Sequence, residues 1–565
     1  MKASPWIHEA PPPGSWRSIF KWGDPGEFKH PNARLRALME RTFSLDASAF
    51  DAPRRPGLEP VDLPLPPGLP PDLLDELRRI LGPGGVETGG YARLRAASGK
   101  TMLDLLRLRH GIAGHLPGAV LFPRNHHEVR RVVELCARRG VPVTPRGGGS
   151  SVTRGLECPK GGVSLDLTRH MDKVLAFNEA DQTVTVEAGM YGPRLEALLN
   201  AAPELFGARH RYTCGHFPQS FEWSTVGGWA VTRGAGQNST YYGKIEDLVV
   251  AQAFVCPAGE IRTPGWPRAA VGPDLDQLLL GGEGAFGVLT EATLRVFRLD
   301  PSTRRRFAYL FPDWESACGA AREILQQEEG LPSVFRLSDA EETDVALKLY
   351  GVEHPVLDAF LALRGLKAGR RCLLIGTADG GEDRARTTAG AVARTARAAG
   401  ALSLTGLVTR AWEHGRFRDP YLREDLQDFG ILTDTLECSV TWSNLARVHR
   451  LVREAVHARP RTICMTHMSH AYPQGGNLYF IFITAMEDMG EYLAFQASIL
   501  DAIRASGASL SHHHGIGRMT APWIEGQLGT PSLDLLRALK AHLDPGNIMN
   551  PGGTLGLDLP RDQRR

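Results

Sequence analysis

The amino-acid sequence predicts an α+β fold arranged as two large lobes, and three observations lead to this prediction. The chain has 565 residues, whereas one domain usually holds about 100–200 residues, so more than one domain is expected. Helical and strand patterns alternate around a glycine-rich loop between residues 125 and 202. The segment "FRLDPSTRRRF" (297–307) marks a boundary, and further helical and strand patterns follow it.

Composition and charge exclude several classes of protein. The chain carries 65 basic and 63 acidic residues, a net charge of +2, so no nucleic-acid partner is expected. No apolar stretch approaches the roughly 18 residues of a membrane-spanning helix, and "LYFIFITAM" (478–486) has the length of a buried strand. The eight cysteines form no C-x-x-C pair, so neither a zinc cluster nor a redox pair is expected.

The first lobe opens with a well-marked helix. Asn125 is expected to cap it, with Glu128 in the capping-box position. Apolar residues follow at helical spacing, and Gly140 is expected to end the helix. These apolar residues are Val129, Val132, Val133 and Cys136. The next residues, "VPVT" (141–144), predict a short strand that leads into a glycine loop.

This glycine loop is the first candidate binding site. Gly147, Gly148 and Gly149 leave the backbone amides accessible to an anion, and Ser150 and Ser151 add hydroxyl donors. A diphosphate is the natural ligand, and a flexible linker is the alternative. No Walker motif is present. A literal G-x-G-x-x-G, "GEGAFG" (282–287), lies after a helical pattern and before a strand pattern, which is the reverse of the order in a dinucleotide turn.

A second candidate site is "SHHHGIG" (511–517). In an extended chain His512 and His514 face one way and His513 the other, so a shared metal ion is disfavoured. The preceding "ASLS" (508–511) predicts a strand that enters a tight turn, which argues against an exposed surface loop. Because imidazoles titrate near neutrality, we interpret these histidines as groups that handle protons.

Four motifs in the first lobe resemble the FAD-binding domain of the vanillyl-alcohol-oxidase (PCMH) type: "VPVTPRGGGSSVTRGLE", "STVGGWAVTRGAG", "YYGKIEDLVV" and "LLLGGEGAFGVLTEATLRV". The resemblance implies a two-lobed flavoprotein with an α/β cap domain. It implies FAD held noncovalently, because no histidine or cysteine occupies the loop position of covalent attachment. The implied FAD-binding positions are Pro145, Arg146, Gly147, Gly148, Gly149, Ser150, Ser151, Pro218, Ser220, Ser224, Thr225, Gly227, Gly228, Arg233, Ala235, Glu283, Gly284, Gly287 and Val288.

The triple histidine and the second lobe resemble the alkylglycerone-phosphate synthase family through "SVFRLSD", "PYLRED", "LECSVTW" and "SHAYPQGGNLYFIF". Related flavin dehydrogenases of 2-hydroxy acids carry glutamate where this chain has His513. The C-terminal "DPGNIMNPGG" is closer to those dehydrogenases. An FAD-dependent 2-hydroxy-acid dehydrogenase or oxidase, of the D-lactate or glycolate type, therefore remains the alternative.

The synthase resemblance implies a reaction without net redox change. A long-chain alcohol replaces the acyl group of acyl-dihydroxyacetone phosphate through an adduct at the flavin N5. The implied catalytic residues are Tyr472, His512, His513 and His514. Arg336 and Arg423 are the candidates for binding the substrate phosphate, because two parallel N–H groups of a guanidinium can bond two phosphate oxygens. Tyr479, inside an apolar strand, is expected in the core, and a structural role for Arg233 is as well supported as a flavin contact.

Four parts follow from these patterns: an N-terminal extension (1–115), the FAD-binding domain (116–297), a cap or substrate domain (298–508) and a C-terminal segment (509–565) that returns to the FAD domain. The extension is rich in Pro and Gly, is partly helical and is expected to wrap the surface. Neither a secretory signal nor a peroxisomal Ser-Lys-Leu end is seen, so the cytoplasm is the expected location. The lipid tails imply contact with the inner membrane face, and a homodimer is a further expectation.

Overall fold

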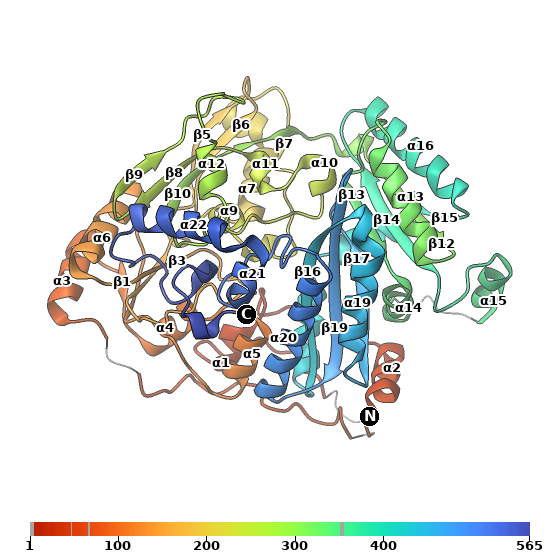
Figure 1. Ribbon diagram of the computed structural model, residues 1–565, viewed down its shortest axis with the longest axis horizontal. Coiled ribbons are helices and arrows are strands. Elements are labelled where there is room, and N and C mark those ends of the chain that lie inside the picture. Colours follow the sequence, from red (N-terminus) through yellow and green to blue (C-terminus); the bar gives the residue numbers. More distant parts are fainter. Residues whose placement is uncertain (1–4, 47, 66–67, 351–354) are drawn as a thin grey trace.

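The structure is a computed structural model that describes residues 5–46, 48–65, 68–350 and 355–565. It consists of two lobes that lie side by side, each with its own sheets and covering helices (Figure 1). The predicted α+β fold is confirmed. Among the described helices, none combines the length and the apolar character needed to cross a lipid bilayer.

The first lobe contains a mixed four-stranded sheet and an antiparallel five-stranded sheet, in the orders β1-β2-β4-β3 and β5-β6-β10-β8-β9. Their strands are β1 (Val86–Glu87), β2 (Ala119–Leu121), β3 (Val143–Arg146), β4 (Val163–Asp166), β5 (Val174–Asn178), β6 (Thr183–Glu187), β8 (Val249–Cys256), β9 (Gly259–Arg262) and β10 (Val288–Arg295). Strands β7 (Tyr212–Thr213) and β11 (Phe297–Arg298) form a separate pair.

The helices of this lobe are α6 (His126–Arg139), α7 (Gly192–Asn200), α8 (Ala202–Phe206), α9 (Val226–Val231), α10 (Ser239–Tyr242), α11 (Ile245–Leu248) and α12 (Leu275–Leu279). Helix α6 forms as predicted: Asn125 accepts a hydrogen bond from the amide of Glu128, and Gly140 ends the helix at φ 62°. The Glu128 carboxylate accepts from the amide of Arg124. The predicted strand at 141–144 begins two residues later, as β3.

The second lobe is built on an antiparallel sheet in the order β15-β12-β14-β13-β17-β19-β16, to which β18 adds beside β19. Its strands are β12 (Arg305–Phe311), β13 (Val334–Ser338), β14 (Cys372–Ala378), β15 (Leu402–Leu404), β16 (Ile431–Thr441), β17 (Thr462–Met468), β18 (Ala471–Tyr472) and β19 (Gly475–Ala485). Its helices are α13 (Trp314–Gln326), α14 (Ala340–Leu349), α15 (Pro355–Leu363), α16 (Glu382–Ala398), α17 (Gly406–Gly415), α18 (Asp419–Gln427), α19 (Leu445–His457) and α20 (Met489–Ala505).

Strand alternation gives this sheet two different faces. Leu432, Leu436, Phe480 and Phe482 belong to one apolar core with residues of α19 and α20. These helices contact strands β16, β17 and β19 and lie together in front of them in Figure 1. Because successive side chains of a strand point to opposite faces, residues 433, 435, 437, 479 and 481 face the other way.

The N-terminal region is partly helical, as expected, but it does not lie wholly on the surface, because part of it joins the core of the second lobe. It forms α1 (Trp16–Phe20), α2 (Ala33–Phe43), α3 (Pro71–Leu81), α4 (Gly90–Ala97) and α5 (Met102–Arg109). Leucines of α5 and aromatic residues of α1 belong to the core of the second lobe. Arg17, which is 0% exposed, makes two hydrogen bonds of 2.8 and 3.0 Å to Asp428 at the end of α18. Arg109 also bonds Asp428, at 2.6 Å.

The C-terminal segment lies against the first lobe, where α21 (Ile524–Leu528) and α22 (Thr530–Leu543) cross it (Figure 1). The amide of Val143 in β3 bonds the carbonyl of Ile548, and the amide of Asn550 bonds the carbonyl of Val143. The segment thereby extends the edge of the sheet that leads into the glycine loop.

Replacing Asp428 by alanine leaves two buried guanidinium groups without their carboxylate. Breaking a buried ion pair from one side costs about 3–5 kcal/mol, so Asp428→Ala is expected to lower the urea midpoint of unfolding markedly. The control is Asp383→Ala, which removes an exposed partner of Arg386 and is expected to change stability by no more than about 0.5 kcal/mol. Equal midpoints for the two variants would contradict the prediction.

Candidate active site

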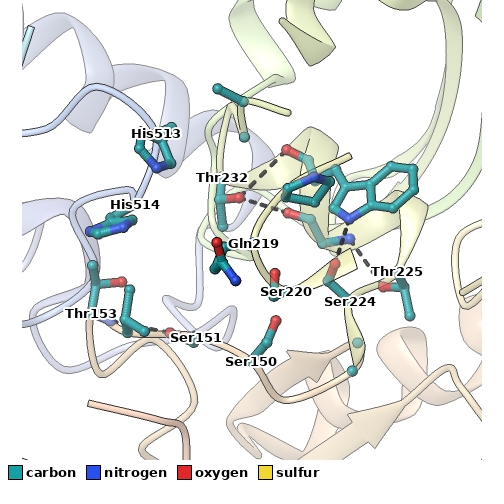
Figure 2. A pocket seen from close by; sticks show the side chains of 18 of the residues that line it. Ser150, Ser151, Thr153, Gln219, Ser220, Ser224, Thr225, Thr232, His513 and His514 are labelled. Atoms are coloured by element: carbon teal, nitrogen blue, oxygen red, sulfur yellow. Dashed lines mark hydrogen bonds between the residues drawn. The ribbon is translucent and has the colours of Figure 1, made fainter. Parts of the chain in front are cut away.

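A cavity of about 350 Å³ lies between the two lobes, a volume in the range of small-molecule sites. The first lobe contributes the loop that follows β3 and the residues around α9. The second lobe contributes residues of β13, β16, β17 and β19, and the C-terminal segment contributes His513 and His514. Figure 2 shows these two histidines on one side of the cavity and Ser224 and Thr225 on the other.

The glycine loop needs its glycines because it packs tightly. A Cβ on Gly147 would overlap the hydroxyl of Thr225, and one on Gly148 would overlap the carbonyl of Trp223. Gly149 has φ 79°, in the left-handed region. The loop backbone and the hydroxyls of Ser150 and Ser151 line the cavity. This close-packed rim of amides and hydroxyls fits a diphosphate group such as that of FAD.

The wall opposite the histidines is the N-terminal end of α9. Thr225 caps this helix by accepting from the amide of Gly228 at 3.2 Å, and Ser224 accepts from the indole of Trp229 at 2.7 Å. Gly227 packs against Ala188, so the helix end lies directly on the sheet of the first lobe. The result is a flat, close-packed surface at the cavity.

On the cap side, one cross-strand row reaches the site. Glu437 of β16 pairs with Tyr479 of β19, which pairs with His467 of β17. The Tyr479 ring stacks on His467 at 4.9 Å between centroids, and both residues line the cavity. The expectation that Tyr479 belongs to the core is wrong, because strand alternation turns it away from Leu478 and Phe480.

The triple histidine forms a bend, and the predicted strand before it is absent. The backbone amides of His512, His513 and His514 all donate to the carboxylate of Glu437, at 2.8–3.1 Å. The hydroxyl of Ser511 donates to the same carboxylate at 2.7 Å. A buried carboxylate therefore determines the course of this loop.

A second buried carboxylate holds the next two residues of the loop. Glu283, in the "GEGAFG" segment of the first lobe, accepts from the amides of Ile516 at 2.6 Å and Gly517 at 2.7 Å. Burial raises the pKa of Glu283 to about 7, although these two bonds oppose the shift. The segment therefore connects the first lobe to the histidine loop.

The side chains of the loop form a chain of contacts. His513 Nδ1 lies 3.0 Å from His512 Nδ1, and His512 Nε2 lies 3.0 Å from the Tyr472 hydroxyl. Burial, together with the nearby Glu246 and Asp247, raises the pKa of Tyr472 above its usual value. Burial lowers the pKa of His512 well below 6.5 and that of His514 to about 4.

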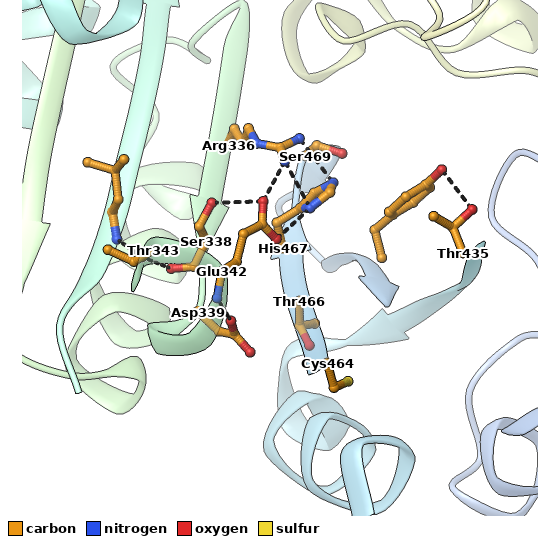
Figure 3. A network of polar contacts seen from close by, with 12 residues as sticks. Arg336, Ser338, Asp339, Glu342, Thr343, Thr435, Cys464, Thr466, His467 and Ser469 are labelled. Carbon is orange, nitrogen blue, oxygen red and sulfur yellow. Dashed lines mark hydrogen bonds and ion pairs between the residues drawn. The ribbon is translucent and has the colours of Figure 1, made fainter. Parts of the chain in front are cut away.

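Arg336 lies in a polar network at the cap end of the cavity (Figure 3). Its guanidinium contacts Glu342 at 2.5 Å and the ring of His467 at 3.1 Å. The charges of His467 and Arg336 outweigh burial and hold the pKa of Glu342 at about 2. Arg423 also lines the cavity; it donates to the carbonyl of Lys100, and its buried Nε has no hydrogen-bond partner among the described residues.

Most of the predicted site residues line this one cavity. They are Pro145, Arg146, Gly147, Gly148, Gly149, Ser150, Ser151, Pro218, Ser220, Ser224, Thr225, Gly227, Gly228, Ala235, Glu283, Gly284, Gly287, Arg336, Arg423, His513 and His514. Tyr472 and His512 lie behind His513. Arg233 turns away to Gln277 and Glu246, and Val288 is buried in β10, so neither lines the cavity.

Several residues that line the cavity were not predicted from the sequence. Trp22 comes from the N-terminal region, and Trp412 from α17. His467, Ser469 and His470 lie on or after β17, within the predicted second lobe. Their one local signal was the polar character of "THMSH" (466–470), in which Met468 is the only apolar residue. Glu437, which lies beneath the loop, had no such signal.

A cation is one alternative occupant of the histidine loop. Ligand atoms of Glu437, His512 and His513 lie within 4.8 Å of one another. However, Oε1 of Glu437 already accepts from Ser511 and from three backbone amides, and Oε2 accepts from His512. The carboxylate oxygens that would bind a cation are thus already engaged in hydrogen bonds from the protein itself.

Gly148→Ala is expected to abolish FAD binding, because the new methyl group collides with a backbone carbonyl and displaces the loop. The flavin absorbance per mole of purified protein measures this. Gly319→Ala, where nothing lies within 4 Å of the added Cβ, is the control and keeps the flavin content of the unaltered protein. A yellow Gly148→Ala protein with full FAD content would contradict the assignment of the loop.

Comparisons with known proteins agree with this architecture. Residues 117–265 match the FAD binding domain family, and residues 300–554 match the C-terminal domain of FAD linked oxidases. An alkyldihydroxyacetonephosphate synthase from Dictyostelium discoideum is 29% identical, covering 94% of this chain and 92% of the relative. One from Trypanosoma brucei brucei is 30% identical, covering 87% and 81%.

A solved alkyldihydroxyacetonephosphate synthase superposes with a TM-score of 0.76 at 27% identity, covering 92% of this chain and 90% of that one. The resemblance of the first-lobe motifs to an FAD-binding domain is confirmed, and FAD is the cofactor. The chain belongs to the alkyldihydroxyacetonephosphate synthase family of FAD-linked enzymes.

Proposed function

We propose that this protein forms the ether bond of ether lipids, by exchanging the acyl group of acyl-dihydroxyacetone phosphate for a long-chain alcohol. The observation that carries the proposal is the meeting of three groups in one cavity: the glycine loop, the histidine loop and the forked cation Arg336. The exchange requires a proton to leave a carbon beside a ketone, a carboxylate to depart and an alcohol to add. The first and the last of these steps move a proton next to a bound phosphate, and the carboxylate departs as an anion with the bonding electron pair.

Arg336 and Arg423 are proposed to bind the substrate phosphate. A guanidinium presents parallel N–H donors that match two phosphate oxygens. Glu342 and His467 hold the Arg336 side chain in place. Because Glu342 stays ionised, it compensates part of the Arg336 charge, and Arg423 supplies a second cation with an unused buried donor. Both guanidinium groups line the cavity and can donate to phosphate oxygens.

FAD, when bound, supplies an electrophile, and the exchange consumes neither oxygen nor a nicotinamide cofactor. We propose that FAD is held noncovalently, since the described first-lobe residues that line the cavity include no cysteine or histidine. The glycine loop would hold the diphosphate, and the N-terminal end of α9 would support the flavin ring. The histidine loop lines the cavity across from this helix end.

The protonation states of the loop suit proton transfer at neutral pH. Tyr472 keeps its proton because its pKa is raised, and His512 and His514 are neutral because burial lowers theirs. Neutral imidazoles accept protons, and the phenol of Tyr472 lies within hydrogen-bonding distance of His512 Nε2. His513 and His514 contact the cavity directly, and Tyr472 acts through His512.

A 2-hydroxy-acid dehydrogenase or oxidase is the alternative function, because the C-terminal half matches the FAD linked oxidase model. Such an enzyme would transfer a hydride from its substrate to the flavin. Anaerobic addition of D-lactate, D-2-hydroxyglutarate or glycolate would then bleach the flavin absorbance rapidly. The synthase proposal expects no bleaching with any of these acids.

The direct test supplies palmitoyl-dihydroxyacetone phosphate and hexadecanol to the FAD-loaded protein under anaerobic conditions. The expected product is hexadecyl-dihydroxyacetone phosphate, with palmitate released in equal amount, measured by mass spectrometry. Because both lipids partition into bilayers, we also propose contact with a membrane surface and expect faster turnover when vesicles carry the substrates. Flavin bleaching by a hydroxy acid, without ether product, would refute the proposal.

Arg336→Lys keeps the positive charge and removes the two parallel N–H donors of the guanidinium. Loss of one bidentate contact is expected to raise KM for the acyl-dihydroxyacetone phosphate by about 10–100-fold, or ~1.4–2.7 kcal/mol, with a smaller change in kcat. Arg305→Lys, at an exposed ion pair with Glu382, is the control and keeps KM. An unchanged KM in Arg336→Lys would remove Arg336 from the phosphate site.

A further inference from the structure

Glu437 is a buried carboxylate that the reaction outlined above does not use. It is 3% exposed and lies on β16, directly beneath the histidine loop. Its Oε1 accepts from the Ser511 hydroxyl and from the three histidine amides, and its Oε2 accepts from the amide of His512. Such a set of donors stabilises the ionised form, so this group accepts hydrogen bonds and donates none.

The same carboxylate faces one ring nitrogen of His513. Oε2 of Glu437 lies 3.4 Å from His513 Nδ1, and that nitrogen lies 3.0 Å from His512 Nδ1. A neutral imidazole carries one N–H and one lone pair. A lone pair on His513 Nδ1 would face the anionic oxygen, whereas an N–H there donates toward both the carboxylate and His512.

We propose that Glu437 is a positioning residue that fixes His513 as the Nδ1–H tautomer and so leaves Nε2 of His513 as the proton acceptor of the cavity. None of the hydrogen bonds among the described residues uses this Nε2, and His513 lines the cavity. This inference rests on the proposed function. A proton passes from the substrate carbon beside the ketone to Nε2, and the bonding electron pair stays on the substrate.

The same assignment orders the hydrogen bonds behind His513. With Nδ1 of His513 as donor, Nδ1 of His512 is an acceptor, so Nε2 of His512 carries its proton. This N–H then donates to the oxygen of Tyr472 at 3.0 Å, and the phenol proton is free for another acceptor. When His513 is protonated, the imidazolium lies beside the Glu437 carboxylate, as in the acid–histidine pairs of hydrolases.

Glu437→Gln is the most specific test. The amide keeps the shape of the side chain and places an N–H₂ donor where a carboxylate oxygen accepted hydrogen bonds. The variant is expected to turn His513 to the Nε2–H tautomer. The expected loss in kcat is about 10²–10⁴-fold, the range for a removed general base, with KM and FAD content unchanged. The pH dependence of kcat should also differ from that of the unaltered protein, because the anion beside His513 Nδ1 is lost.

Asp434→Asn is the matched control on the same strand. Asp434 is buried, its carboxylate accepts from Tyr492 at 2.8 Å, and it does not line the cavity. The amide change there is expected to leave kcat and its pH profile as in the unaltered protein. A general loss of stability caused by an amide in β16 would lower both variants equally and would overturn the assignment.

A spectroscopic measurement tests the tautomer without relying on turnover or on the variant. Nitrogen-15 NMR of histidine-labelled FAD-loaded protein distinguishes Nδ1–H from Nε2–H, and the spectrum of His513→Gln identifies the His513 signals. The proposal expects Nδ1–H at neutral pH. An Nε2–H signal, full activity of Glu437→Gln, or one equivalent of metal bound in the purified protein would overturn it. Absence of ether product from the unaltered enzyme would instead refute the proposed function and leave the tautomer result standing.

Discussion

The course of one short loop depends on two buried carboxylates, one from each lobe. Glu437 of the cap sheet binds the amides of His512, His513 and His514, and Glu283 of the FAD lobe binds those of Ile516 and Gly517. An unpaired buried carboxylate is costly, so each one is stable only while the loop supplies its donors. The loop in turn keeps its bend only while both carboxylates remain in place. The position of the histidine loop and the placement of the two lobes beside it therefore depend on the same hydrogen bonds.

The proposed assignments place a cofactor, a substrate phosphate and proton transfer in one cavity. The diphosphate end is built from backbone amides and hydroxyls, which bind anions without titrating. The substrate phosphate is assigned to Arg336 and Arg423, at the cap side. The proposed proton-transfer groups lie on the histidine loop, where burial keeps the imidazoles of His512 and His514 neutral. Charge binding and proton transfer are thus separated in space.

Local patterns were sufficient to predict the structure of a segment where neighbouring residues determine it. The cap of α6 at Asn125, its apolar face and its end at Gly140 follow from neighbouring residues, and so does the glycine loop. Motif order identified the FAD-binding lobe. These features depend on contacts within a few residues, which a sequence displays directly.

Features that depend on distant partners were missed. The histidine loop bends because of Glu437, which is distant in sequence. The N-terminal helices α1 and α5 join the core of the second lobe, where Arg17 and Arg109 bond Asp428, also distant in sequence. Tyr479 was expected in the core because its neighbours are apolar, but alternation places it on the cavity face. A Pro- and Gly-rich composition suggested a surface extension, although Trp22 from that region lines the cavity.

The central claim is that the two carboxylates hold the histidine loop against the flavin. A crystal structure of the protein with FAD bound measures this most directly. We expect the flavin ring between the N-terminal end of α9 and the side chains of His513 and His514, with Glu283 and Glu437 still bonded to the loop amides. A flavin ring outside this gap, or a loop released from either carboxylate, would contradict it.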